Sequence, residues 1–164
     1  MTVSVSTAAR AGLLVAALSL GGATAQAAMS PFRAMAGSWA GGGVINLANG
    51  DQERLRCRAA YDVDGSGSAM RLNLKCASDS YNFDLASDVE YRGGAISGVW
   101  TESSRNASGS LEGRASGDRL EVAARGQSFS ANLSLTTHGS RQTVSIRPQQ
   151  GADITAVSLE LNRR

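Results

Sequence analysis

Apolar and polar residues alternate one by one along most of the chain from Trp39 onward, a pattern typical of half-buried β-strands. The alternation is clearest between Glu53 and Ser78. There the apolar positions are Leu55, Cys57, Ala59, Tyr61 and Val63, followed by Met70, Leu72, Leu74 and Cys76. Glycines and serines at 65–68 separate the two runs. This stretch therefore predicts two strands joined by a tight turn.

One register of this hairpin satisfies its turn, its apolar face and its two cysteines together. A turn at 65–68 sets Cys57 opposite Cys76 and Asp62 opposite Arg71. It also pairs Ala59 with Leu74, Tyr61 with Leu72, and Val63 with Met70. A slip of one residue would turn every side chain to the wrong face. Because directly opposed residues bring their Cβ atoms to about 4.5–5.5 Å, we predict a structural disulfide between Cys57 and Cys76.

A metal or redox site at this hairpin is the weaker interpretation. The chain has a single histidine, His138, and no CxxC motif. The stretch from Asp62 to Gly67 resembles the start of a calcium loop, but Asn73 stands where such a loop needs its glutamate. Aspartate and glycine are also the residues that a turn requires. We therefore expect a turn here, and no metal or cofactor in the protein.

The same alternation continues to the C-terminus and predicts an all-β fold. Strands are expected near 39–47, 54–63, 70–76, 81–91, 96–100, 111–115, 119–125, 128–135, 143–147 and 157–161. Turn residues separate them, and the region after the N-terminal 27 residues lacks helical periodicity. We predict an antiparallel up-and-down meander of about 8–10 strands that forms a small barrel. The short segment 29–36 is expected to form a helical turn that plugs one end.

The first residues have the three parts of a signal peptide. Arg10 precedes an apolar run, 11–25, and Ala25-Gln26-Ala27 is a small-x-small cleavage site. We expect a signal peptide at 1–27 and a single β-barrel domain at 28–164, in the periplasm or secreted. A buried N-terminal helix is the alternative. Export fits the disulfide, because disulfides persist in oxidising compartments. We expect no integral membrane segment after cleavage.

Charge and composition limit the classes of partner and environment that fit the protein. Cleavage would leave 15 basic and 14 acidic residues, a balance that argues against nucleic-acid binding. An outer-membrane barrel, with its apolar face outward, remains a distant alternative. Aromatic residues make up only 5% of the chain, too few for two interfacial girdles, and the last residue, Arg164, is not aromatic. We therefore expect the apolar face inside, in a barrel surrounded by water.

A short motif before the first predicted strand carries a family resemblance. Ala36-Gly37-Ser38-Trp39 resembles the Gly-x-Trp opening of the calycin barrels, the lipocalins and avidin-type proteins. The resemblance implies that Trp39 packs across the closed end of the barrel. The predicted strand count departs from the eight of those barrels, and the biotin-contact residues of avidins have no match. The mature chain also resembles small exported bacterial proteins of uncharacterised family.

The interior of such a barrel suggests the function. Six aromatic residues are candidates to line a ligand site: Trp39, Tyr61, Phe83, Tyr91, Trp100 and Phe129. Inward glycines and alanines accompany them, and they either leave a cavity for a small apolar ligand or let the barrel flatten and pack. A filled core with no ligand is the alternative, because protein interiors normally pack densely.

Catalytic signatures are weak in this sequence. His138 lies in a predicted turn, and none of the serines sits in a nucleophile elbow. Glu102 falls on the inward face by parity, and we expect it to lie beyond the end of its strand. Asp84, Asp88 and Glu90 are expected to pair with outward basic residues. We predict a non-enzymatic, exported barrel that binds a small apolar ligand. A cell-envelope interaction protein without a ligand is the alternative, and an esterase or glycosidase comes third.

Overall fold

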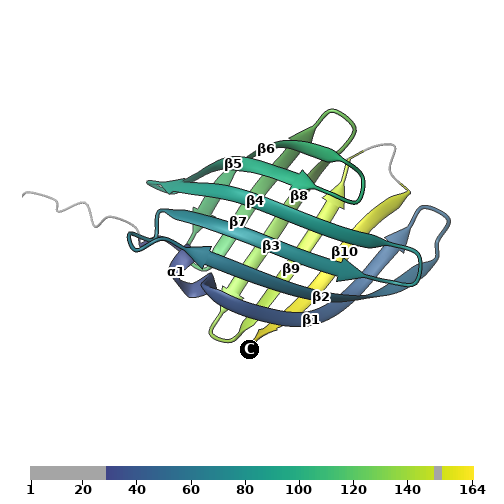
Figure 1. The fold of residues 1–164 in the computed structure, drawn as a ribbon, viewed down its shortest axis with the longest axis horizontal. Helices are drawn as coiled ribbons and strands as arrows, with labels where there is room; N and C mark the ends of the chain where they lie inside the picture. Colours follow the sequence, from purple (N-terminus) through teal and green to yellow (C-terminus); the bar gives the residue numbers. More distant parts are fainter. Residues whose placement is uncertain (1–28, 150–152) are drawn as a thin grey trace, which may run out of the picture.

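Ten antiparallel strands close into one barrel in the computed structural model of the protein, which describes residues 29–149 and 153–164 (Figure 1). The elements are α1 (Phe32–Met35), β1 (Gly37–Leu47), β2 (Gln52–Val63), β3 (Ala69–Ala77), β4 (Asn82–Arg92), β5 (Ala95–Glu102), β6 (Ala107–Ser116), β7 (Arg119–Gly126), β8 (Ser130–His138), β9 (Arg141–Pro148) and β10 (Ile154–Arg163). The predicted all-β meander is confirmed, at the upper end of the predicted strand number. The predicted signal peptide and its cleavage site lie outside the described residues.

Each strand pairs with its neighbours in sequence, and one long-range pairing closes the barrel. β1 pairs with β10, so that Trp39 lies opposite Arg163 and Gly43 lies opposite Leu159. The other nine pairings join strands that follow one another along the chain. Sequence neighbours usually pair in antiparallel sheets, which is why local alternation predicted most of the topology.

The hairpin of β2 and β3 has the predicted register. Cys57 lies opposite Cys76 and the two form a disulfide, as predicted. The turn that joins the strands is held by Asp64, whose carboxylate accepts hydrogen bonds from the Ser66 hydroxyl and from the amide of Ala69. These hydrogen bonds lower the pKa of Asp64 to about 2. The aspartate that resembled a calcium ligand therefore serves the turn.

Glycines allow the barrel to flatten at two opposite corners. On β1, a Cβ added to Gly43 would lie 1.8 Å from the carbonyl oxygen of Ser158 on β10. On β6, a Cβ added to Gly113 would lie 2.1 Å from the carbonyl oxygen of Glu121 on β7. β1 and β6 are diametrically opposite in the closed order of strands. β1 and β6 thus lie between two layers, β2–β5 and β7–β10, whose strands cross in Figure 1.

The apolar side of each strand faces the interior, as predicted for a barrel surrounded by water. In β2, for example, Leu55, Cys57, Ala59 and Tyr61 are buried, and the residues between them are exposed. This orientation is the opposite of the one that a lipid-facing barrel requires. No helix among the described residues is long and apolar enough to cross a membrane.

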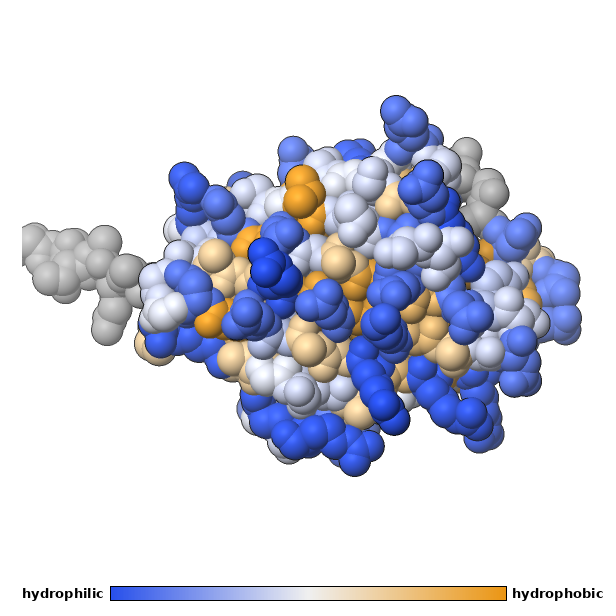
Figure 2. Space-filling model, in the orientation of Figure 1, coloured by the Kyte–Doolittle hydropathy of each residue, from blue (hydrophilic) through white to orange (hydrophobic). Residues whose placement is uncertain are grey.

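The outer face carries charged side chains in cross-strand pairs. Arg71 lies 2.9 Å from Asp88, and Lys75 lies 2.9 Å from Asp84, in both cases between β3 and β4. The predicted pairing of the β4 carboxylates with outward basic residues is confirmed for these two. Figure 2 shows hydrophilic side chains spread over this side of the molecule, with small apolar areas between them. Each exposed pair stabilises the fold only weakly, by about 0.2–1 kcal/mol.

Candidate functional site

One end of the barrel is closed by the short helix α1. Its residues Phe32 and Met35 are fully buried, and the ring of Phe32 meets the ring of Tyr91 edge to face at 6.1 Å between centroids. Trp39 lies beside them, buried, and its indole N–H donates to the carbonyl of Met35 at 2.7 Å. The predicted plug and the closed-end position of Trp39 are therefore both present.

Two arginines fix this plug to the barrel. Arg163 on β10 donates to the carbonyls of Ala34 and Ala36 and lies 4.4 Å from the ring centroid of Trp39. Arg33 on α1 donates to the carbonyls of Gly65 and Ser66 in the turn between β2 and β3. These hydrogen bonds satisfy carbonyls that a four-residue helix and a turn leave without partners.

A chain of buried polar side chains lies at the same end. The Tyr61 hydroxyl donates to Gln142 Oε1 at 2.7 Å, and Gln142 Nε2 donates to Thr137 Oγ1 at 3.0 Å. Burial raises the pKa of Tyr61, which the hydrogen bond to Gln142 offsets only in part. Tyr61 therefore remains a neutral hydrogen-bond donor, and the closed end is a packed and satisfied core rather than a reactive site.

The middle of the barrel differs from its closed end. Some apolar residues that point inward from opposite strands remain only half-buried: Leu72, Leu74 and Leu85 on β3 and β4, and Leu133, Leu135, Val144 and Ile146 on β8 and β9. β3 lies diametrically opposite β8, and β4 lies opposite β9, in the closed order. Inward residues in the middle of strands of a filled barrel would be fully buried. We call the space that the strands enclose between the two layers the lumen, and these half-buried residues, which pack against the buried core, form its wall.

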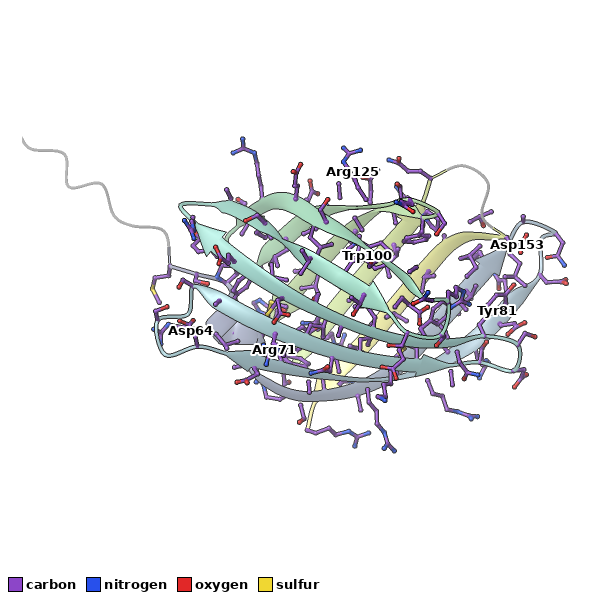
Figure 3. The ribbon with its side chains drawn as sticks, turned by 45° about the horizontal axis from the view of Figure 1, so that its top comes forward. Asp64, Arg71, Tyr81, Trp100, Arg125 and Asp153 are labelled. Atoms are coloured by element: carbon purple, nitrogen blue, oxygen red, sulfur yellow. A yellow bond between two sulfur atoms is a disulfide. The ribbon has the colours of Figure 1, made fainter. Side chains whose placement is uncertain are left out.

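The six aromatic candidates separate along the barrel axis. Trp39, Tyr61 and Tyr91 belong to the packed closed end. Phe83 and Trp100 point inward from the parts of β4 and β5 nearer the other end, and Phe129 lies in the loop between β7 and β8. Figure 3 shows Asp64 at the end near α1, and Tyr81 and Asp153 at the opposite end, which α1 does not cover and which we call the open end. The sequence did not identify the aliphatic residues of the lumen wall as site residues. Alternation predicts whether a side chain points inward, but not where along the barrel axis it lies.

Aromatic side chains surround the open end. Tyr81 and Phe83 stack with their ring centroids 6.2 Å apart, and the guanidinium of Arg105 lies 4.6 Å from the ring centroid of Phe83. Trp100 meets Phe129 edge to face at 5.9 Å. Phe129 is one of the few large apolar residues that is exposed. This end thus carries two pairs of aromatic side chains and the guanidinium of Arg105.

Glu102 corrects an expectation from the sequence. We expected it to lie beyond the end of its strand, but it is the last residue of β5 and its side chain is buried. Its carboxylate accepts hydrogen bonds from the amides of Asp84, Ser104 and Arg105. Burial raises the pKa of Glu102, but these hydrogen bonds outweigh burial and hold the pKa below its ordinary value. Glu102 therefore organises the turn between β5 and β6.

Replacement of Glu102 by Gln is expected to lower the free energy of unfolding at pH 7 by about 2 kcal/mol, because a carboxamide cannot accept all three amide hydrogen bonds. The native pKa lies below the unfolded one, near 4.5. The contribution of Glu102 is therefore complete above that value and is lost as the pH falls through the native pKa.

Urea denaturation of the wild type and the variant at pH 7 and pH 3 measures this difference. The gap between the two proteins should narrow at pH 3. Glu112→Gln on the exposed outer side of β6 is the matched control and should change stability little at either pH. A gap that stays constant with pH would contradict the role given to the carboxylate.

The fold and its site define a class: a calycin-like, ten-stranded barrel with one plugged end and one open end. The structure of Rv2717c from M. tuberculosis is similar, with a TM-score of 0.66 and 14% identity over 80% of this chain and 93% of that one. The S-type phycobiliprotein lyase CPES from Guillardia theta is also similar, with a TM-score of 0.58 and 10% identity over 81% of this chain and 89% of that one. The sequence matches no protein-family model and no curated protein. At these identities the likeness concerns the fold alone.

Proposed function

We propose that this protein is an exported, non-enzymatic barrel that binds a small apolar molecule in its lumen. The observation that carries the proposal is the half-buried state of the seven inward aliphatic residues of the lumen wall on β3, β4, β8 and β9. When a ligand covers apolar surface that would otherwise contact water inside a barrel, each Å² contributes about 25 cal/mol to the free energy of binding.

The architecture supports such a site. Eight strands enclose an interior just wide enough to be filled by side chains or to hold one small ligand, and the diameter grows with strand number. Ten strands therefore enclose a wider space than eight. The plug at α1 closes one end, so a ligand would enter past the aromatic residues at the other.

A lumen-filling variant tests the proposal with a neutral apolar dye, N-phenyl-1-naphthylamine. We expect the wild type to bind the dye and to enhance its fluorescence. Leu133→Trp places a large ring in the lumen and should weaken binding at least about tenfold, since a tenfold change needs only about 1.4 kcal/mol of lost contact. Asn132→Trp, one position earlier on the outer face of β8, is the matched control and should bind like the wild type. Equal binding by the two variants, or none by the wild type, would overturn the proposal.

A second candidate function rests on a row of arginines on the outer face of β2. Arg54, Arg56 and Arg58 point outward at every second position, about 7 Å apart. Within residues 29–149 and 153–164, none of the three forms an ion pair. The outward residues opposite them on β1 are Val44, Gly42 and Ala40, which leave the guanidinium groups uncovered. This row fits an interaction with an anionic surface of the cell envelope.

Sedimentation with vesicles of phosphatidylglycerol and phosphatidylcholine tests this second candidate. The triple variant Arg54→Ser, Arg56→Ser and Arg58→Ser should lose binding that salt also weakens. A control variant removes three other exposed arginines of β6, β7 and β9, by Arg114→Ser, Arg125→Ser and Arg147→Ser, and changes the net charge equally. If both variants lose vesicle binding equally, net charge alone explains the binding, and a specific surface on β2 is contradicted.

A further inference from the structure

One polar atom in the barrel wall lacks a partner. Trp100 is 4% exposed, and its indole Nε1 is the one buried side-chain nitrogen or oxygen without a hydrogen bond among the described residues. The other tryptophan, Trp39, donates its indole N–H to Met35. A buried donor without an acceptor is costly, and such groups are rare in native proteins. The indole N–H of Trp100 therefore needs an explanation that the fold alone does not provide.

The surroundings of Trp100 are shaped to hold the ring on the lumen side of the wall. Its inward neighbours on β6 and β7 are Gly109 and Gly126, which lie directly opposite one another. A Cβ on Gly109 would lie 2.8 Å from Nε1, and one on Gly126 would lie 2.9 Å from the indole carbon Cζ2. The ring thus lies across a pair of glycines. Ser87 on β4 is the inward neighbour on the other side.

One exposed side chain lies against this ring. Phe129 contacts Trp100 edge to face from the loop between β7 and β8 and is 36% exposed. Rotation of an exposed side chain is rapid, on the picosecond to nanosecond scale. A molecule entering at the open end can therefore take the place of the Phe129 ring and reach the edge of Trp100, which Figure 3 shows between the two ends of the barrel.

We propose that the ligand of the lumen is an apolar molecule with a neutral hydrogen-bond acceptor, a carbonyl oxygen, that the N–H of Trp100 binds. This inference rests on the proposed lumen function and specifies its ligand class. A carboxylate is disfavoured, because the half-buried residues of the lumen wall include no basic residue, and Arg105, the cation near Phe83, already lies 3.5 Å from the carboxylate of Glu102. The Ser87 hydroxyl can donate to the same oxygen.

Two probes of nearly equal shape test the proposal: butyrophenone and butylbenzene, which differ by a carbonyl in place of a methylene. Spectra that correlate 15N and 1H contain two indole signals, since the chain has two tryptophans, and Trp39→Phe assigns the remaining one to Trp100. Butyrophenone should move the Trp100 N–H proton downfield, and butylbenzene should not. Trp100→Phe keeps an aromatic ring without the donor. It should raise the Kd of butyrophenone about tenfold and leave that of butylbenzene unchanged.

The outcomes separate this inference from the function on which it rests. If both probes bind and Trp100→Phe weakens them equally, with no downfield shift in the wild type, the carbonyl class is overturned and the apolar lumen stands. If neither probe nor the dye binds, the lumen function itself is overturned. The shift in the wild-type spectrum decides the question even if Trp100→Phe does not fold.

Discussion

Replacement of Trp39 by Ala is expected to lower the free energy of unfolding by about 4 kcal/mol, because the change leaves a large cavity in the packed end of the barrel. Trp39 is 1% exposed, donates to Met35 and supports the guanidinium of Arg163. Removal of the indole thus also loosens two of the contacts that hold α1, while those of Arg33 with Gly65 and Ser66 remain. Urea denaturation followed by the fluorescence of Trp100, the one remaining tryptophan, measures the loss.

Trp39→Phe is the matched control for this prediction. A phenyl ring fills most of the volume and loses the hydrogen bond to Met35, so its cost should be well below that of Ala. Equal unfolding midpoints for the Phe and Ala variants would contradict the packing role. A wild-type midpoint for the Ala variant would show that the closed end does not depend on Trp39.

Replacement of Gly43 by Ala is expected to cost more than about 3 kcal/mol, at or above the upper end for added groups in a packed interior. The new methyl group would lie 1.8 Å from the carbonyl oxygen of Ser158. That oxygen belongs to the backbone of β10, so relief requires β1 and β10 to move apart at the pairing that closes the barrel. Thermal unfolding monitored by circular dichroism checks the expected loss.

Gly65→Ala provides the control, because a Cβ at Gly65 would have open space around it and the turn does not hold this residue at positive φ. This variant should unfold at nearly the temperature of the wild type. Similar losses at the two positions would indicate that glycine flexibility, rather than the close approach of β1 and β10, governs stability.

Local alternation made most of this fold predictable. The register of β2 and β3 followed from the turn and from the apolar face, and it placed Cys57 against Cys76 where the disulfide lies. The sequence also indicated the short plug before β1. β6 begins at Ala107, earlier than predicted, because Ser108, Gly109 and Ser110 have no apolar alternation to reveal a strand.

The same pattern could not predict how completely each inward side chain is buried. Tyr61 and Leu72 are cross-strand neighbours that both point inward, yet Tyr61 is buried and Leu72 is only half-buried. That difference depends on α1 and on the pairing of β1 with β10, which join residues far apart in sequence. The unpaired N–H of Trp100 and the burial of Glu102 depend on loops whose geometry alternation does not encode.

Closure of the ring by β1 and β10 has a consequence for association. Both lateral sides of the ten strands are occupied, so within residues 29–149 and 153–164 the protein offers no exposed sheet edge onto which another chain could add a strand. The folded barrel therefore cannot polymerise by edge-to-edge pairing of strands, and it cannot bind a partner by β-augmentation. Any protein that recognises it must do so through side chains and loops, and a variant that opens the β1–β10 seam would be the first to aggregate.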